Sequence, residues 1–78
     1  MFTFTSSATF RYESPMTLDG AKFTAVLTKL TLNRYDVRVF DNYFNQVLHA
    51  HSPIFKGNYD AAVEQANKYL TQLGFVPA

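Results

Sequence analysis

Two histidines have the spacing of metal ligands, since His49 and His51 are separated by one residue. Side chains at i and i+2 of a strand lie on the same face, so the two imidazoles could share an ion. If a strand over 33–41 pairs with a strand over 45–51, Asp36 lies opposite His49 and would add a carboxylate ligand. Such an open site would hold zinc or nickel only weakly. We favour a solvated strand face with an Asp36–His49 pair, and predict no metal and no cofactor.

Other catalytic chemistry lacks its sequence motifs. The serines and histidines stand in no strand–elbow–helix or oxyanion motif, and the acidic residues fall on different predicted elements. The chain has no cysteine, so it has neither a thiol nucleophile nor a thiolate zinc site. The glycines at positions 20, 57 and 74 are scattered and form no phosphate-binding loop. The sequence therefore predicts a protein that is not an enzyme.

Length and composition limit the architecture that can carry any site. The chain has 78 residues, of which 47% are hydrophobic, 17% aromatic and 17% charged, with a net charge of +1. This size predicts one domain over 1–78 with a small core. The near-zero charge argues against binding to DNA or anionic lipid mainly by electrostatic attraction. No segment has the roughly 18 apolar residues of a membrane span, and we expect a cytoplasmic protein.

The first elements are read from the spacing of apolar residues. Residues 2–12 alternate with period two, which predicts a strand with an irregularity at Ser6-Ser7 and an end at Ser14-Pro15. Over 17–31, the spacing of Phe23, Val26, Leu27 and Leu30 predicts a helix from about residue 18 to residue 30. The alternative for this segment is a strand that starts after an Asp19-Gly20 turn.

The second half predicts a hairpin and a helix. Residues 33–41 and 45–51 alternate, and if Phe40 pairs with Asn45, Tyr35 and Val37 lie on the core face. A helix follows Asn58, its predicted N-cap. Gly74 is predicted to end the helix in a Schellman motif, with Phe75 contacting Leu70. The apolar stripe of this helix is predicted to be Ala62, Ala66, Tyr69, Leu70 and Leu73.

These elements predict an α+β fold. We expect a small two-layer sandwich in which an antiparallel sheet of three to four strands carries one or two helices on one face. The expected order is β-α-β-β-α, and the alternative is β-β-β-β-α.

The expected order of the last sixty residues (helix, strand, strand, helix) resembles part of a double-stranded-RNA-binding domain. That family holds phosphates with a lysine pair at the start of its last helix. The matching positions here read Gly57-Asn58-Tyr59-Asp60-Ala61, with one acid and no lysine. The resemblance therefore covers element order and implies, as the alternative function, a nucleic-acid-associated module.

Thirteen aromatic residues are more than so small a core needs. Periodicity assigns eight of them to the interior: Phe2, Phe4, Phe10, Tyr12, Phe23, Tyr35, Tyr69 and Phe75. Phe40, Tyr43, Phe44, Phe55 and Tyr59 remain, and three of these crowd a predicted turn. Exposed aromatics with polar neighbours are typical of protein-binding surfaces, while the alternative is a local cluster over the sheet end. The predicted partner-binding site is Phe40, Asp41, Asn42, Tyr43, Phe44 and Asn45.

We therefore expect a small non-enzymatic protein-binding domain that inhibits or modulates a larger protein assembly. Among proteins of this size and charge, the analogy is with phage or mobile-element inhibitors of host defence, such as anti-CRISPR proteins. The expected partner is a protein complex, and nucleic acid is the second choice. A monomer and a homodimer formed through the charge-poor N-terminal strand both remain open.

Overall fold

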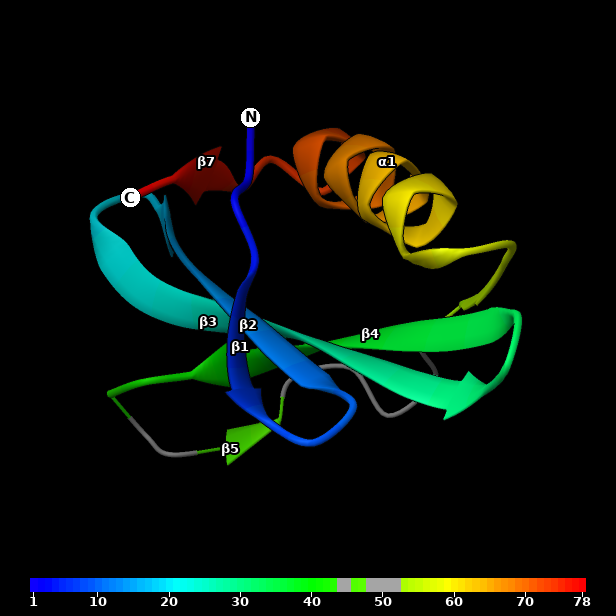
Figure 1. The fold of residues 1–78 in the computed structure, drawn as a ribbon. Helices are drawn as coiled ribbons and strands as arrows, with labels where there is room; N and C mark the ends of the chain where they lie inside the picture. The colour runs from blue at the N-terminus through cyan, green and yellow to red at the C-terminus, as the bar shows by residue number, and fades with distance from the viewer. Residues whose placement is uncertain (44–45, 48–52) are drawn as a thin grey trace.

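The computed structural model describes residues 1–43, 46–47 and 53–78. Within these ranges the chain forms a seven-stranded antiparallel sheet and one helix. The helix lies across one face of the twisted sheet, and the two ends of the chain lie on the same side of the molecule (Figure 1). The elements are β1 (Thr5–Ala8), β2 (Arg11–Leu18), β3 (Ala21–Thr31), β4 (Arg34–Asp41), β5 (Gln46–Val47), β6 (Ile54–Lys56), α1 (Tyr59–Gln72) and β7 (Val76–Pro77).

The sheet is built on three long central strands. Its order is β1-β2-β3-β4-β5, with β6 also paired to β4 and β7 also paired to β2. The outer edge of β2 is thus shared by β1 and β7, and that of β4 by β5 and β6. The predicted order β-α-β-β-α with a sheet of three to four strands is wrong. The alternative order β-β-β-β-α also has too few strands.

The largest difference from the predicted fold is β3, since the helix expected over 18–30 is a strand. It follows an Asp19-Gly20 turn in which both residues have positive φ (51° and 83°), as a type I′ hairpin requires. The helical spacing misleads because β3 is central and carries apolar side chains on both faces. Ala25 and Leu27 face the helix, while Val26 faces the opposite side and is also buried.

The predicted strand over 2–12 is in fact a hairpin. β1 ends at Ala8, Thr9 and Phe10 form the turn, and β2 continues through Pro15 to Leu18. The expected irregularity at Ser6-Ser7 is confirmed, because the β1–β2 register shifts between Ser6 and Ala8.

Pro15 does not end the strand. Its carbonyl accepts a hydrogen bond from Ala78 N at 3.1 Å, on the β7 side of β2. In an extended strand the nitrogen faces the same neighbour as the carbonyl, so no hydrogen bond to β3 is lost.

The predicted register of the second hairpin is also wrong. Phe40 pairs with Val47, not with Asn45. Farther along β4, Tyr35 pairs with Phe55 and Asp36 with Ile54, so Asp36 does not lie opposite His49. His49 and His51 themselves lie outside the described residues.

Both predicted caps of α1 are confirmed. The Asn58 side chain accepts a hydrogen bond from Ala61 N at 2.9 Å. At the other end, Phe75 N donates to Leu70 O at 3.1 Å and Gly74 N to Thr71 O at 3.0 Å, the hydrogen bonds of a Schellman motif. Gly74 has φ +96°, which glycine adopts without strain.

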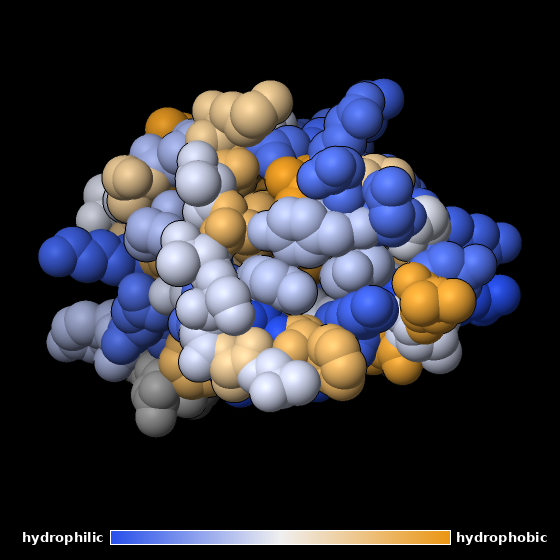
Figure 2. All heavy atoms as spheres, viewed as in Figure 1, coloured by the Kyte–Doolittle hydropathy of each residue, from blue (hydrophilic) through white to orange (hydrophobic). Residues whose placement is uncertain are grey.

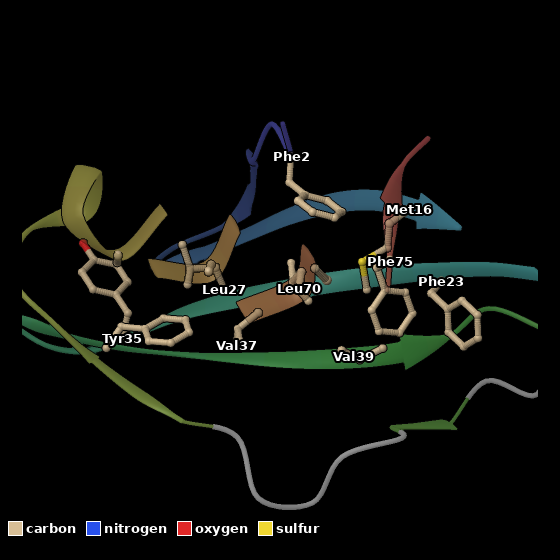
Figure 3. Packing of buried hydrophobic residues seen from close by; sticks show 13 residues of the cluster. Phe2, Met16, Phe23, Leu27, Tyr35, Val37, Val39, Leu70 and Phe75 are labelled. Atoms are coloured by element: carbon tan, nitrogen blue, oxygen red, sulfur yellow. The ribbon is translucent and has the colours of Figure 1, made fainter. Parts of the chain in front are cut away.

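The core lies between α1 and the face of the sheet that we call the helix face. Ala62, Ala66 and Leu70 are the buried residues of the helix, and alanines allow its backbone to approach the strands closely. Figure 3 shows Leu70 reaching into a layer formed by Phe2, Met16, Phe23, Leu27, Tyr35, Val37, Val39 and Phe75.

The N-terminal residues pack beside α1 and complete this core. Asn67 of α1 accepts a hydrogen bond from Phe2 N at 2.6 Å and donates one to Phe2 O at 3.2 Å. This pair of bonds positions the Phe2 ring, which is fully buried beside the helix. The predicted interior place of Phe10 is wrong, since that ring is exposed, and Phe55 is buried in its stead.

Candidate functional site

The predicted partner-binding site spans the end of β4 and the residues that follow it, and the structure describes its first four residues. Phe40 is half-buried and Asp41 is buried, with its carboxylate accepting a hydrogen bond from Tyr43 N at 2.9 Å. Asn42 Oδ1 accepts a hydrogen bond from Thr24 Oγ1 at 2.8 Å, which fixes the turn against β3. Tyr43 is 84% exposed. Phe44 and Asn45 lie outside the described residues.

A surface hollow adjoins this turn. It has a volume of about 640 Å³ and lies between the β2–β3 turn, at Gly20 to Lys22, and the segment from Asp41 to Tyr43. Asn42 N donates to Lys22 O at 3.2 Å and ties the two walls together. The exposed Tyr43 ring thus borders a concave surface of defined shape.

The opposite face of the sheet, which we call the open face, carries no helix in the described part of the chain. It comprises the alternate residues of β2, β3 and β4 that include Arg11, Thr24 and Asp36, together with Ile54 and Lys56 of β6. Its charged residues are Arg11, Lys22, Arg34, Arg38 and Lys56 against Glu13 and Asp36, a net charge of 5 − 2 = +3. The whole chain carries +1, so the remaining surface carries 1 − 3 = −2. The small net charge conceals a charge separation between the faces.

A hollow of about 290 Å³ opens on this face. Its walls include Val26 and Phe40, and its polar groups come from Arg11, Thr28, Asp36 and Arg38. A smaller hollow of about 180 Å³ beside it shares Arg11, Val26 and Phe40. Because the two hollows share these three lining residues, we refer to them together as the depression of the open face.

Asp36 is the unusual group in this depression. Its side chain is only 8% exposed, and its Oδ1 atom is buried without a hydrogen-bond partner among the described residues. Arg38 Nε lies 3.6 Å from Oδ2, which gives an ion pair but is too long for a hydrogen bond. Arg11 is similarly loosely held, with its Nε atom 3.9 Å from Glu13 Oε2. The depression therefore combines a buried acceptor with two guanidinium groups that form ion pairs, and no hydrogen bond, with the described residues.

Exposed apolar side chains gather at one end of the sheet. Phe10 is 57% and Leu32 85% exposed, and Leu30 between them is also exposed. They border a hollow of about 300 Å³. Lys29 Nζ lies 5.5 Å from the centre of the Phe10 ring, a cation–π contact. In Figure 2, hydrophobic spheres lie among hydrophilic ones at the right-hand end of the molecule, where β3 ends and β4 begins in Figure 1.

The backbone of Phe10 is strained. Its φ of +61° places a bulky aromatic residue in the left-handed region, where glycine or asparagine is usual. A side chain there costs about 1–2 kcal/mol relative to ordinary backbone. Because more than half of Phe10 is exposed, its partial burial does no more than offset this cost. Strain at an exposed aromatic side chain is typical of a contact residue.

Three tyrosines form a cluster on the helix face. The Tyr59 ring centre lies 4.7 Å from that of Tyr12 and 6.3 Å from that of Tyr35. Burial, and secondarily the neighbouring Tyr12, raises the pKa of both Tyr35 and Tyr59 above the ordinary 10.0. The burial that raises these two pKa values also makes the Tyr35 and Tyr59 rings packing groups.

The hypothetical metal site gains no support from the described residues. Across residues 1–43, 46–47 and 53–78, no group of three or more His, Asp or Glu side chains could hold an ion. The described part of the chain also contains no helix long and apolar enough to cross a membrane.

Sequence reasoning missed the depression around Asp36. The alternation of Arg34, Asp36 and Arg38 is present in the sequence, but by itself it predicts a solvated strand face. The missing information was the pairing of β2 with β3, which brings Arg11 beside Val26 and Thr28.

Compared with known protein families, with curated proteins and with solved structures, the chain gives no match. The function must therefore be argued from the surface itself.

Proposed function

We propose that this protein is a non-enzymatic binding domain that acts by occupying a surface of a larger protein. The observation that carries the proposal is the exposed apolar end of the sheet, with Phe10 held in a strained backbone. Aromatic side chains bury a large area on binding and contribute strongly to interface energetics, and exposed aliphatic neighbours extend the apolar area that a partner can cover. The exposed Tyr43 at the opposite end of β3 offers a second anchor. Inhibition or modulation of that partner is part of the proposal.

The test is a comparison of two baits. The purified protein is immobilised and its bound proteins are quantified by mass spectrometry, next to a Phe10→Gly, Leu32→Ser double variant. The matched control is Val76→Ser, which removes another exposed apolar side chain, on β7. The proposal predicts one stoichiometric protein complex, retained by the control and lost by the double variant. Equal recovery by all three baits would contradict it.

A second candidate function is nucleic-acid binding by the open face, favoured by its net charge of +3. The resemblance to a double-stranded-RNA-binding domain no longer supports it, because its first helix is β3. The support now comes from five basic side chains on one sheet face, which can track a phosphate backbone.

This candidate is tested by salt dependence. Binding of a single-stranded oligonucleotide should weaken with a slope in log K against log[salt] of about −0.7 per phosphate contacted. Arg34→Gln and Lys56→Gln should reduce the slope, whereas Lys68→Gln on α1 should leave it unchanged. A slope near zero would contradict the candidate.

A further inference from the structure

We infer that the depression around Asp36 is a base pocket that takes a guanine of a single-stranded nucleic acid. The inference rests on the second candidate function, that nucleic acid binds the open face, and adds the base that the face reads. Its basis is the buried carboxylate of Asp36, which lines a hollow open to solvent and whose Oδ1 atom has no hydrogen-bond partner among residues 1–43, 46–47 and 53–78.

The first step concerns what Asp36 lacks. A buried acceptor without a donor destabilises the folded state, and a ligand that supplies an N–H removes that penalty. Within the described part of the chain, Oδ1 has no hydrogen-bond partner and Oδ2 has the 3.6 Å ion pair with Arg38 alone. A ligand with two adjacent N–H donors can bond both oxygens once the carboxylate turns Oδ1, which is buried in the free protein, toward the hollow.

The second step concerns which ligands have that edge. Among the bases, guanine presents N1–H and the N2 amino group side by side. Adenine and cytosine place an acceptor beside their amino group, and uracil places carbonyls on both sides of its N3–H. Single-stranded bases are commonly read on this Watson–Crick edge.

An arginine side chain from a partner protein also presents two adjacent N–H donors. The positive charge of the open face favours guanine over such an arginine. Arg11 and Arg38 line the hollow with Asp36, a local net charge of 2 − 1 = +1, on a face of net charge +3. A guanidinium would be repelled, while the phosphates that flank a guanine would be attracted. The same two arginines can donate to those phosphates.

The third step concerns shape. Val26 is buried and Phe40 half-buried, so the hollow has an apolar wall and an aromatic ring against which a base can pack. Its volume of about 290 Å³ lies at the lower limit of small-molecule pockets, which suits one base and leaves the sugar and phosphate at the rim.

The experiment uses fluorescein-labelled pentaribonucleotides UUGUU, UUAUU and UUIUU, in which inosine lacks the N2 amino group, and fluorescence anisotropy. We expect UUGUU to bind about tenfold more tightly than UUAUU, as one bidentate base contact gives, and UUIUU to fall between them. In Asp36→Asn the guanine preference should shrink to within about twofold, because UUGUU loses its base contact while UUAUU, which has no such contact, binds more tightly once a negative charge is lost. The control Asp19→Asn, on the β2–β3 turn, should keep the preference.

Wild-type amide chemical shifts provide a readout that does not depend on a variant. UUGUU should shift Val26, Asp36 and Phe40 more than Glu64 on α1. If the three oligonucleotides bind equally, and if Asp36→Asn leaves their affinities unchanged, the guanine pocket is wrong. The proposal that nucleic acid binds the open face would still hold in that case. Absence of binding by all three would overturn both. Shifts at Asp36 caused by the peptide acetyl-Gly-Arg-Gly-amide and by no oligonucleotide would assign the pocket to a protein partner.

Discussion

Replacement of Phe10 by glycine and by alanine measures the strain in the β1–β2 turn. Both variants lose the ring, but only glycine adopts φ near +61° without penalty. The ring is 57% exposed, so about 43% of roughly 200 Å² is buried, and removing it costs up to about 2 kcal/mol. Both variants also lose the cation–π contact with Lys29, worth about 0.5–1 kcal/mol.

The difference between the two variants isolates the backbone contribution. Alanine retains the left-handed penalty of about 1–2 kcal/mol, so the Phe10→Gly variant should be the more stable of the two by about 1 kcal/mol or more. This order reverses the usual one, in which glycine is about 0.5–1 kcal/mol worse than alanine within regular structure.

The assay is urea unfolding followed by far-ultraviolet circular dichroism, with equal m-values as the condition for comparison. Thr9 is the matched control, because it shares the turn and is not among the described residues with positive φ. Thr9→Gly should be less stable than Thr9→Ala. If alanine at position 10 proves as stable as glycine, the argument from strain at Phe10 fails.

Three further predictions concern the packing around α1. Gly57→Ala should cost about 2 kcal/mol or more, because its φ is +114° and a Cβ would come within 2.8 Å of a helix side chain. Gly20→Ala, with positive φ and open space around it, should cost only about 1 kcal/mol in the same urea assay. Asn67→Ala should cost about 1–3 kcal/mol through its two bonds to Phe2 and speed exchange of the Phe2 amide, whereas Asn67→Asp should lose only the donor. Because burial raises the pKa of Tyr59 above 10.0, its contribution to stability is complete below pH 10 and is lost as pH rises through the folded value. The urea midpoint should therefore fall above pH 10, less steeply in Tyr59→Phe.

Local signals in the sequence predicted the helix well. The Asn58 cap and the Gly74 stop depend on residues within one turn of each end, and both are observed. The order and number of strands depend on partners far along the chain. Val26 shows the difficulty, because its burial on the open face broke the alternation that would have identified β3 as a strand.

The candidate site was harder to predict for a related reason. For Tyr43, its place in a predicted turn left two alternatives, exposure or a local cluster over the sheet end, and exposure is the one observed. The strain at Phe10 could not be predicted from the sequence, because the alternation of apolar and polar residues continues through the β1–β2 turn. The near-zero net charge predicts no strong electrostatic field at the surface. In the structure, however, Arg34 and Lys56 lie side by side on the open face, because β6 pairs with β4. Pairing between distant strands decides which charges meet, and composition does not record it.

The bonds between Asn67 and Phe2, and the pairing of β2 with β7, affect how the chain folds during its synthesis. Sixty-five residues separate Phe2 from its partner on the helix. While β2, β3 and β4 emerge from the ribosome, the apolar residues of the helix face have no helix to cover them. Folding must wait until residues near 67 are made, and such long-range closure is slow. In that interval the exposed strands can associate with other nascent chains, so a chaperone that shields them should raise the yield of folded protein.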